Sequence, residues 1–160
     1  MSRTVAALLA GFIAIAVNSL LLLAADLVPL TTAHGGLLRL LQMMTGLHLP
    51  ATSAFKWGFH GAVGLGMALV YAYVMEPAFP ASAIIKGLLY ALVVWCLNSA
   101  FVLPLIGEGF AGSQHLTFAG MAWFAGAHTT FFVCLALLYA QFREEARDGS
   151  RGIPEETRVQ

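Results

Sequence analysis

The chain has 160 residues, of which 59% are hydrophobic and only 10% charged, and its eight basic residues balance its eight acidic ones. A soluble domain carries about 25% charged residues, so this composition indicates a membrane protein. A net charge of zero gives no indication of a nucleic-acid partner. A membrane span needs roughly 20 mostly apolar residues. Four such stretches, at about 5–25, 55–75, 83–105 and 119–142, use nearly the whole chain and exclude a separate soluble catalytic domain.

The first span, at about 5–25, has the arginine and the small residues that also mark a signal peptide. Its apolar run is longer than the 7–15 residues of a secretory signal. It also contains Asn18-Ser19, which recurs in the third span as Asn98-Ser99. We therefore expect this segment to be retained as a membrane span.

The connection between the first two spans, residues 26–53, is long enough for a further element. Its part from Leu37 to Met44 is mostly apolar, with polar residues three positions apart. This spacing is typical of a short helix that lies in the membrane interface. Glycines and prolines on both sides mark where this helix is expected to begin and end.

The second and fourth spans repeat one pattern. The stretch that opens with Gly58-Phe59-His60 closes with Ala68-Leu69-Val70-Tyr71-Ala72, and the stretch that opens with Gly126-Ala127-His128 closes with Ala136-Leu137-Leu138-Tyr139-Ala140. The first and third spans align on Asn18 and Asn98. We therefore expect an all-α fold: an integral membrane antiparallel four-helix bundle of two helical hairpins, about 4–76 and 83–142, related by a twofold axis along the membrane normal.

The charge distribution predicts the orientation. With the N-terminus inside, the inner segments hold six of the basic residues and the outer ones hold only Arg39 and Lys56. Basic residues favour the cytoplasmic side, so we expect a multi-pass protein of the inner (plasma) membrane with both termini cytoplasmic. Residues 1–142 form one transmembrane domain, and 143–160 a cytoplasmic tail, largely disordered. Expected partners are the lipid bilayer and further membrane subunits or a second copy.

The polar residues within the spans are the candidate ligand-binding site. Buried amides and imidazoles need hydrogen-bond partners where water is absent, and helix rise places the asparagines and histidines in the outer half of the membrane. They can pair across the bundle as packing contacts, bind a ligand, or line a proton or substrate pathway. The tyrosines lie three helical turns beyond the histidines. The candidates are His60, His128, Asn18, Asn98, Tyr71 and Tyr139.

Two cofactors are compatible with these histidines. His60 and His128, on equivalent helices, could ligate one b-type haem from opposite faces. The outer loops hold the remaining histidines with two carboxylates, a ligand set that suits zinc or copper, but their spacings match no compact metal motif. The candidate metal ligands are His34, His48, His115, Asp26 and Glu108.

A four-span protein of this size, with Gly-x-His near the start of the second and fourth spans and outer turns rich in Gly and Pro, resembles small uncharacterised bacterial inner-membrane families of unknown function. The resemblance implies the fold and the membrane and assigns no catalytic residue. From the sequence we expect a non-enzymatic accessory subunit or small-ligand carrier. The alternatives are a bis-histidine haem redox protein and a metal-binding protein of the outer side.

Overall fold

The computed structural model describes residues 1–28, 30–31, 35–50 and 52–151, with side chains described up to Ala146, and over these ranges the chain is helical with no strand. The main helices are α1 (Arg3–Asp26), α2 (Gly36–Thr45), α3 (Ser53–Val70), α5 (Ala83–Leu97) and α7 (Phe118–Arg151). The predicted all-α class is confirmed, and so is a helix in the first connection, at α2.

Four helical segments are long and apolar enough to cross a membrane: Arg3–Asp26, Ser53–Ala78, Ala83–Leu105 and Phe118–Ala146. They agree closely with the four predicted spans. Three of them begin where a hydroxyl side chain accepts from a backbone N–H three residues on, which satisfies one of the free donors at a helix start. These caps are Ser2, Thr52 and Ser82.

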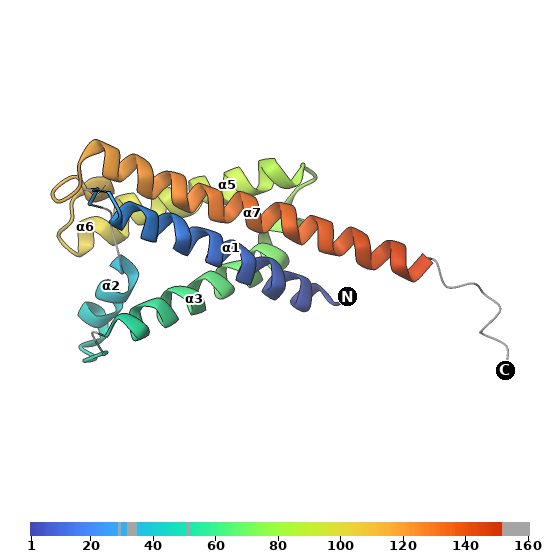
Figure 1. Ribbon diagram of the computed structural model, residues 1–160, viewed down its shortest axis with the longest axis horizontal. Coiled ribbons are helices and arrows are strands. Elements are labelled where there is room, and N and C mark those ends of the chain that lie inside the picture. Colours follow the sequence, from blue (N-terminus) through green and yellow to red (C-terminus); the bar gives the residue numbers. More distant parts are fainter. Residues whose placement is uncertain (29, 32–34, 51, 152–160) are drawn as a thin grey trace.

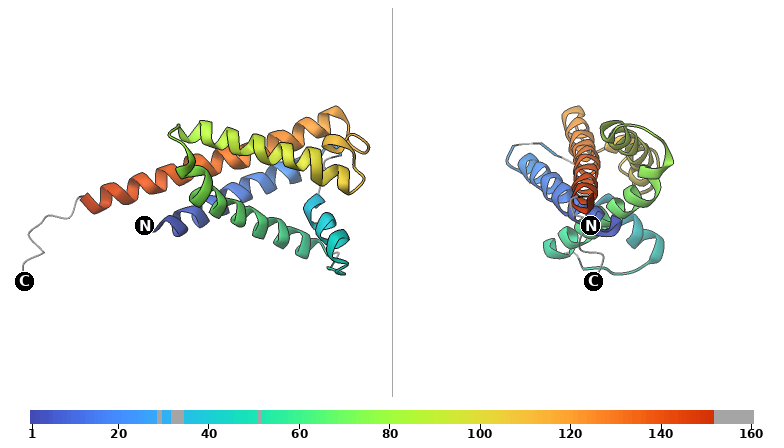
Figure 2. Two further views of the ribbon diagram at one scale, coloured as in Figure 1. Left: turned by 180° about the vertical axis from the view of Figure 1, so that it is seen from behind. Right: turned by 90° about the vertical axis from the view of Figure 1, so that its right-hand side faces the viewer.

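The helices converge at one end of the molecule and diverge at the other (Figures 1 and 2). We call these the narrow end, where the chain starts, and the wide end, where α2 lies. Helix α1 packs against α7 and α3, and α5 packs against α7. Helix α3 begins beside α2 at the wide end, apart from the other helices, and crosses α1 on its way to the narrow end.

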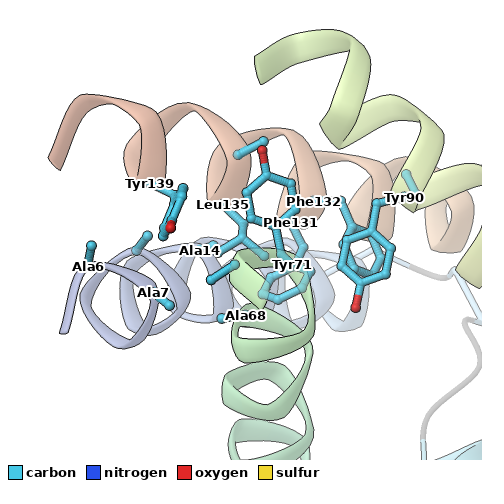
Figure 3. Close-up of a cluster of buried hydrophobic side chains, with 14 residues drawn as sticks. Ala6, Ala7, Ala14, Ala68, Tyr71, Tyr90, Phe131, Phe132, Leu135 and Tyr139 are labelled. Atoms are coloured by element: carbon cyan, nitrogen blue, oxygen red, sulfur yellow. The ribbon is translucent and has the colours of Figure 1, made fainter. Parts of the chain in front are cut away.

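The hydrophobic core lies near the narrow end and is built largely from alanine and aromatic side chains (Figure 3). Small residues let helix backbones approach closely. A Cβ atom added to Gly11 would lie 2.6 Å from Cβ of Ala68, and one added to Gly64 would lie 2.6 Å from Cδ1 of Ile15. These two contacts fix the point where α1 and α3 cross.

Polar contacts close the narrow end. The Thr4 and Tyr73 hydroxyls are 2.7 Å apart and join α1 to the end of the second span. Nζ of Lys86 donates to the backbone carbonyl of Glu76 at 2.6 Å, which joins the second span to α5. The helices are therefore tied together at this end.

Two segments within the spans form π-helical turns, η1 (Tyr71–Met75) and η2 (Asn98–Val102), which continue into α4 (Glu76–Ala78) and α6 (Leu103–Leu105). Pro77 and Pro104 stand at the same distance beyond the start of each. A proline inside an α-helix lacks an N–H and collides with the carbonyl four residues earlier. Widening the preceding turn relieves this collision, so the prolines account for both π-turns.

The packing of the described helices does not follow the predicted twofold symmetry. That symmetry would give the extensive α1–α7 contact a counterpart between α3 and α5, but among the described residues these two helices share no comparable packing. In the repeat alignment Ala24 stands opposite Pro104, and Glu145 opposite Pro77. The prolines thus break the symmetry, because only one member of each pair of spans carries a π-turn. The repeat itself stays a prediction from the sequence.

The last helix extends further than its predicted boundary at Phe142. Helix α7 runs on to Arg151, so the first half of the predicted tail is helical. The remainder, 152–160, lies outside the described residues.

Candidate functional site

A cleft of about 740 Å³ occupies the wide end, where α3 diverges from the other helices. Helix α3 forms one wall, α1, α5 with η2 and α7 form the others, and α2 also lines the cleft. Most of its surface is apolar, contributed by side chains such as Val63, Met67, Val94, Phe131 and Phe132. Helices α3 and α5 meet where the Tyr90 hydroxyl donates to the Met67 carbonyl at 3.2 Å, and the cleft lies where the twofold symmetry would extend this contact.

All four asparagine and histidine candidates line this cleft: Asn18 from α1, His60 from α3, Asn98 from the start of η2, and His128 from α7. The sequence analysis predicted that they would lie close together, and the structure places them on one surface. Their hydrogen bonding differs between the two halves of the chain.

Asn18 joins three helices through its amide. Its Nδ2 donates to the backbone carbonyl of Ala127 on α7 at 2.9 Å, which leaves its Oδ1 as the acceptor. Nε2 of His60 lies 3.0 Å from this oxygen and must therefore donate, so the proton is on Nε2. Asn18 is 1% exposed and His60 is half-buried, so this asparagine–histidine pair is a packing contact at one edge of the cleft.

His128 is arranged differently from His60. Its Nδ1 lies 2.9 Å from the carbonyl oxygen of Phe124, one turn earlier in α7. A carbonyl only accepts, so Nδ1 carries the proton and Nε2 of the neutral ring is an acceptor. Among the described residues, nothing donates to this Nε2. The Phe124 ring packs on the imidazole with the ring centroids 4.2 Å apart.

Asn98 lines the cleft but, within the part of the chain that the structure describes, its side-chain amide makes no hydrogen bond. It is the first residue of η2, whereas its counterpart Asn18 lies in regular helix. Among the described residues, Asn98 and His128 are therefore not hydrogen-bonded to each other, whereas Asn18 and His60 are.

The two candidate tyrosines do not line the cleft. Tyr71 and Tyr139 lie in the core near the narrow end, with ring centroids 5.6 Å apart in an edge-to-face arrangement (Figure 3). The two tyrosines occupy equivalent positions in the repeat, and they do lie together in the structure. The structure places them as a packing pair, apart from the asparagine and histidine residues.

The candidate metal ligands are only partly brought together. Oε2 of Glu108 lies 3.0 Å from Nδ1 of His115, and the same carboxylate pairs with Arg39 of α2. This pairing ties α2 to the turn that follows α6. His34 lies outside the described residues, and no three His, Cys, Asp or Glu side chains among those described are grouped as a metal site. The metal site remains a prediction from composition, and Asp26 and His48 add no third ligand to this pair.

Several residues of the cleft were missed by the sequence analysis. Gln42 of α2 and Ser53 of α3 also line the cleft. Gln42 belongs to the polar positions of the predicted interfacial helix, and Ser53 belongs to no pattern. Trp57 also lines the cleft, and its ring centroid is 5.8 Å from that of His60 in an edge-to-face contact. A tryptophan one turn before a histidine within an apolar segment is the sequence signal that could have identified it.

The chain is an all-helical protein with four helices that could span a membrane and a largely apolar cleft at one end of them. Comparison with protein families, with curated protein sequences and with solved structures found no match.

Proposed function

We propose that this protein is an integral protein of the bacterial inner membrane, with both termini cytoplasmic, that holds a small, mostly apolar ligand in the cleft between α3 and α5. In this orientation the wide end lies in the outer half of the bilayer. The protein acts as a carrier or as an accessory subunit that presents the ligand to another protein, without catalysis of its own.

The outward faces of the helices support membrane insertion. Large apolar side chains are exposed along the spans, among them Phe12 at 66%, Leu20 at 67% and Phe101 at 60%. In water such surfaces would aggregate, whereas in lipid they are favourable. The distribution of lysine and arginine supports the orientation.

The cleft is the observation that carries the ligand-binding proposal. Binding sites for small molecules are concave and mostly apolar, with a few polar groups that fix orientation, and measure about 300–1,000 Å³. This cleft is about 740 Å³ and combines apolar walls with the histidine and asparagine side chains. It lies beside helices with lipid-facing surfaces, so an apolar ligand could enter from the bilayer.

Filling the cleft should block binding. We expect Val94→Phe to weaken binding of a diacylglycerol with brominated acyl chains roughly tenfold, the factor that corresponds to about 1.4 kcal/mol. Bromine quenches tryptophan on contact, so the measurement is Trp57 fluorescence in detergent, with Trp95 and Trp123 replaced by phenylalanine. Trp57 lines the cleft and the other two do not.

Val93→Phe is the matched control, because Val93 is 49% exposed and lies outside the cleft. It should leave the quenching unchanged. Equal quenching in the parent protein, Val94→Phe and Val93→Phe would contradict a ligand site in this cleft.

A haem-binding function is the second candidate, because His60 and His128 line the same cleft from α3 and α7. Ligation through Nε2 of His60 would require the hydrogen bond to Asn18 to break. If haem binds, protein purified from haem-supplemented cells should show a Soret band that His60→Ala abolishes. A colourless preparation would exclude this candidate and leave the apolar-ligand proposal standing.

A further inference from the structure

Two polar groups on the walls of the cleft are left without a protein partner among the described residues. One is Nε2 of His128, an acceptor because Nδ1 donates to Phe124. The other is the side-chain amide of Asn98, which offers one acceptor oxygen and two donor hydrogens. Polar groups in apolar surroundings normally have hydrogen-bond partners, and each that lacks one calls for an explanation.

A bound ligand is the explanation that the surroundings favour. Phe124 packs directly on the His128 ring, and Leu97, Phe131 and Phe132 line the same part of the cleft. The corresponding groups of the first repeat, Asn18 and His60, satisfy each other. In the second pair no such bond joins Asn98 to His128 among the described residues.

The donor and acceptor pattern defines the chemistry of the ligand. Nε2 of His128 needs a donor, and Asn98 can donate to an oxygen or accept from a hydroxyl. Burying a charge among these aromatic and aliphatic side chains would be costly without a countercharge. The charged residues that line the cleft, Asp26, Arg39 and Lys56, come from the end of α1, from α2 and from the first turn of α3, whereas Asn98 and His128 come from η2 and from within α7.

We infer that the cleft selects an uncharged lipid alcohol. Its hydroxyl donates to Nε2 of His128, Asn98 bonds to the same hydroxyl or to a neighbouring oxygen, and the apolar body lies along the aliphatic and aromatic walls. This inference rests on the proposed function, and it adds which polar group of the ligand the site recognises.

The test compares alcohols with their methyl ethers, which keep the apolar body and remove only the donated hydrogen. Dioleoylglycerol and its methyl ether form one pair, and geranylgeraniol and its methyl ether form the other. Each competes with the brominated diacylglycerol for the cleft, and Trp57 fluorescence reports the competition. In the parent protein each alcohol that binds should do so about tenfold more tightly than its ether, which is the effect of one buried hydrogen bond.

His128→Asn is the diagnostic variant. An asparagine amide can keep the bond to the Phe124 carbonyl through the nitrogen that replaces Nδ1, but it has no atom at the position of Nε2. The preference for alcohol over ether should fall from about tenfold to about twofold or less. The ratio is informative even if the variant is less stable, because both members of a pair have the same apolar body. Asn98→Leu should reduce the same ratio by a smaller factor. It is the variant to test if His128→Asn does not fold.

Equal binding of alcohol and ether by the parent protein would overturn the inference, and so would a preference that survives in both variants. Either result leaves the cleft as a binding site for apolar ligands. If instead neither pair competes and Val94→Phe changes nothing, the proposed function itself fails. Competition by only one pair identifies the apolar body as a diacylglycerol or an isoprenoid, whereas competition by both means that the cleft recognises the hydroxyl alone.

Discussion

Replacing Gly87 with leucine is expected to destabilise the protein by about 3 kcal/mol, at the upper end of the usual cost of overpacking a core. A Cβ atom at this position would lie 2.9 Å from both the carbonyl oxygen of Phe132 and Cα of Val133. Both are backbone atoms of α7, so no side-chain rotation can make room. Helix α5 must move away from α7, and the contact between the two helices is lost. The change in the free energy of unfolding is measured by titrating the protein in mixed micelles with dodecyl sulfate.

Gly66→Leu is the control for this prediction. Gly66 also lies in a spanning helix, but nothing lies within 4 Å of a Cβ atom added there. It should change the free energy of unfolding by less than about 0.5 kcal/mol. Similar losses in the two variants would mean that leucine disturbs these helices in general, and that the close approach of α5 and α7 is not what Gly87 provides.

Replacing Asn18 with leucine is expected to cost about 2 kcal/mol, because this buried amide makes two hydrogen bonds between helices. The change leaves Nε2–H of His60 without its acceptor and removes the bond from α1 to the Ala127 carbonyl. The same unfolding titration measures the loss.

Asn98→Leu is the matched variant from the second repeat. Because the Asn98 side chain makes no hydrogen bond among the described residues, its loss should change stability by less than about 0.5 kcal/mol and should affect ligand binding instead. Equal destabilisation by the two substitutions would contradict the distinction between a structural asparagine at 18 and a binding asparagine at 98.

The four long apolar helices could be predicted from the sequence because their hydropathy follows from local composition. The histidines and asparagines could be singled out because polar groups are costly in apolar segments. Their pairing could not be predicted fully. The repeat suggested two equivalent pairs, and the structure has one hydrogen-bonded pair, Asn18 with His60, and one that is open.

One asymmetry between the two halves is visible in the sequence: Pro104 has no counterpart in the first helix, where Ala24 stands at the aligned position. In the structure the π-turn that precedes Pro104 begins at Asn98, whereas Asn18 lies in regular helix. The divergence of α3 from the other helices could not be predicted, because it depends on where Gly11 and Gly64 let that helix cross α1. Such crossing geometry is set by contacts between distant segments, and a hydropathy pattern carries no information about it.

Helix α3 has 18 residues and is therefore about 27 Å long. It is held to α1 at two heights: at the crossing, where Gly64 lies against Ile15, and nearer the wide end, where His60 is bonded to Asn18. A rod fastened at two points along its length cannot swing about one of them without breaking the other. The width of the cleft is therefore set by the side chains along this seam, and a molecule that enters must fit a gap of given size.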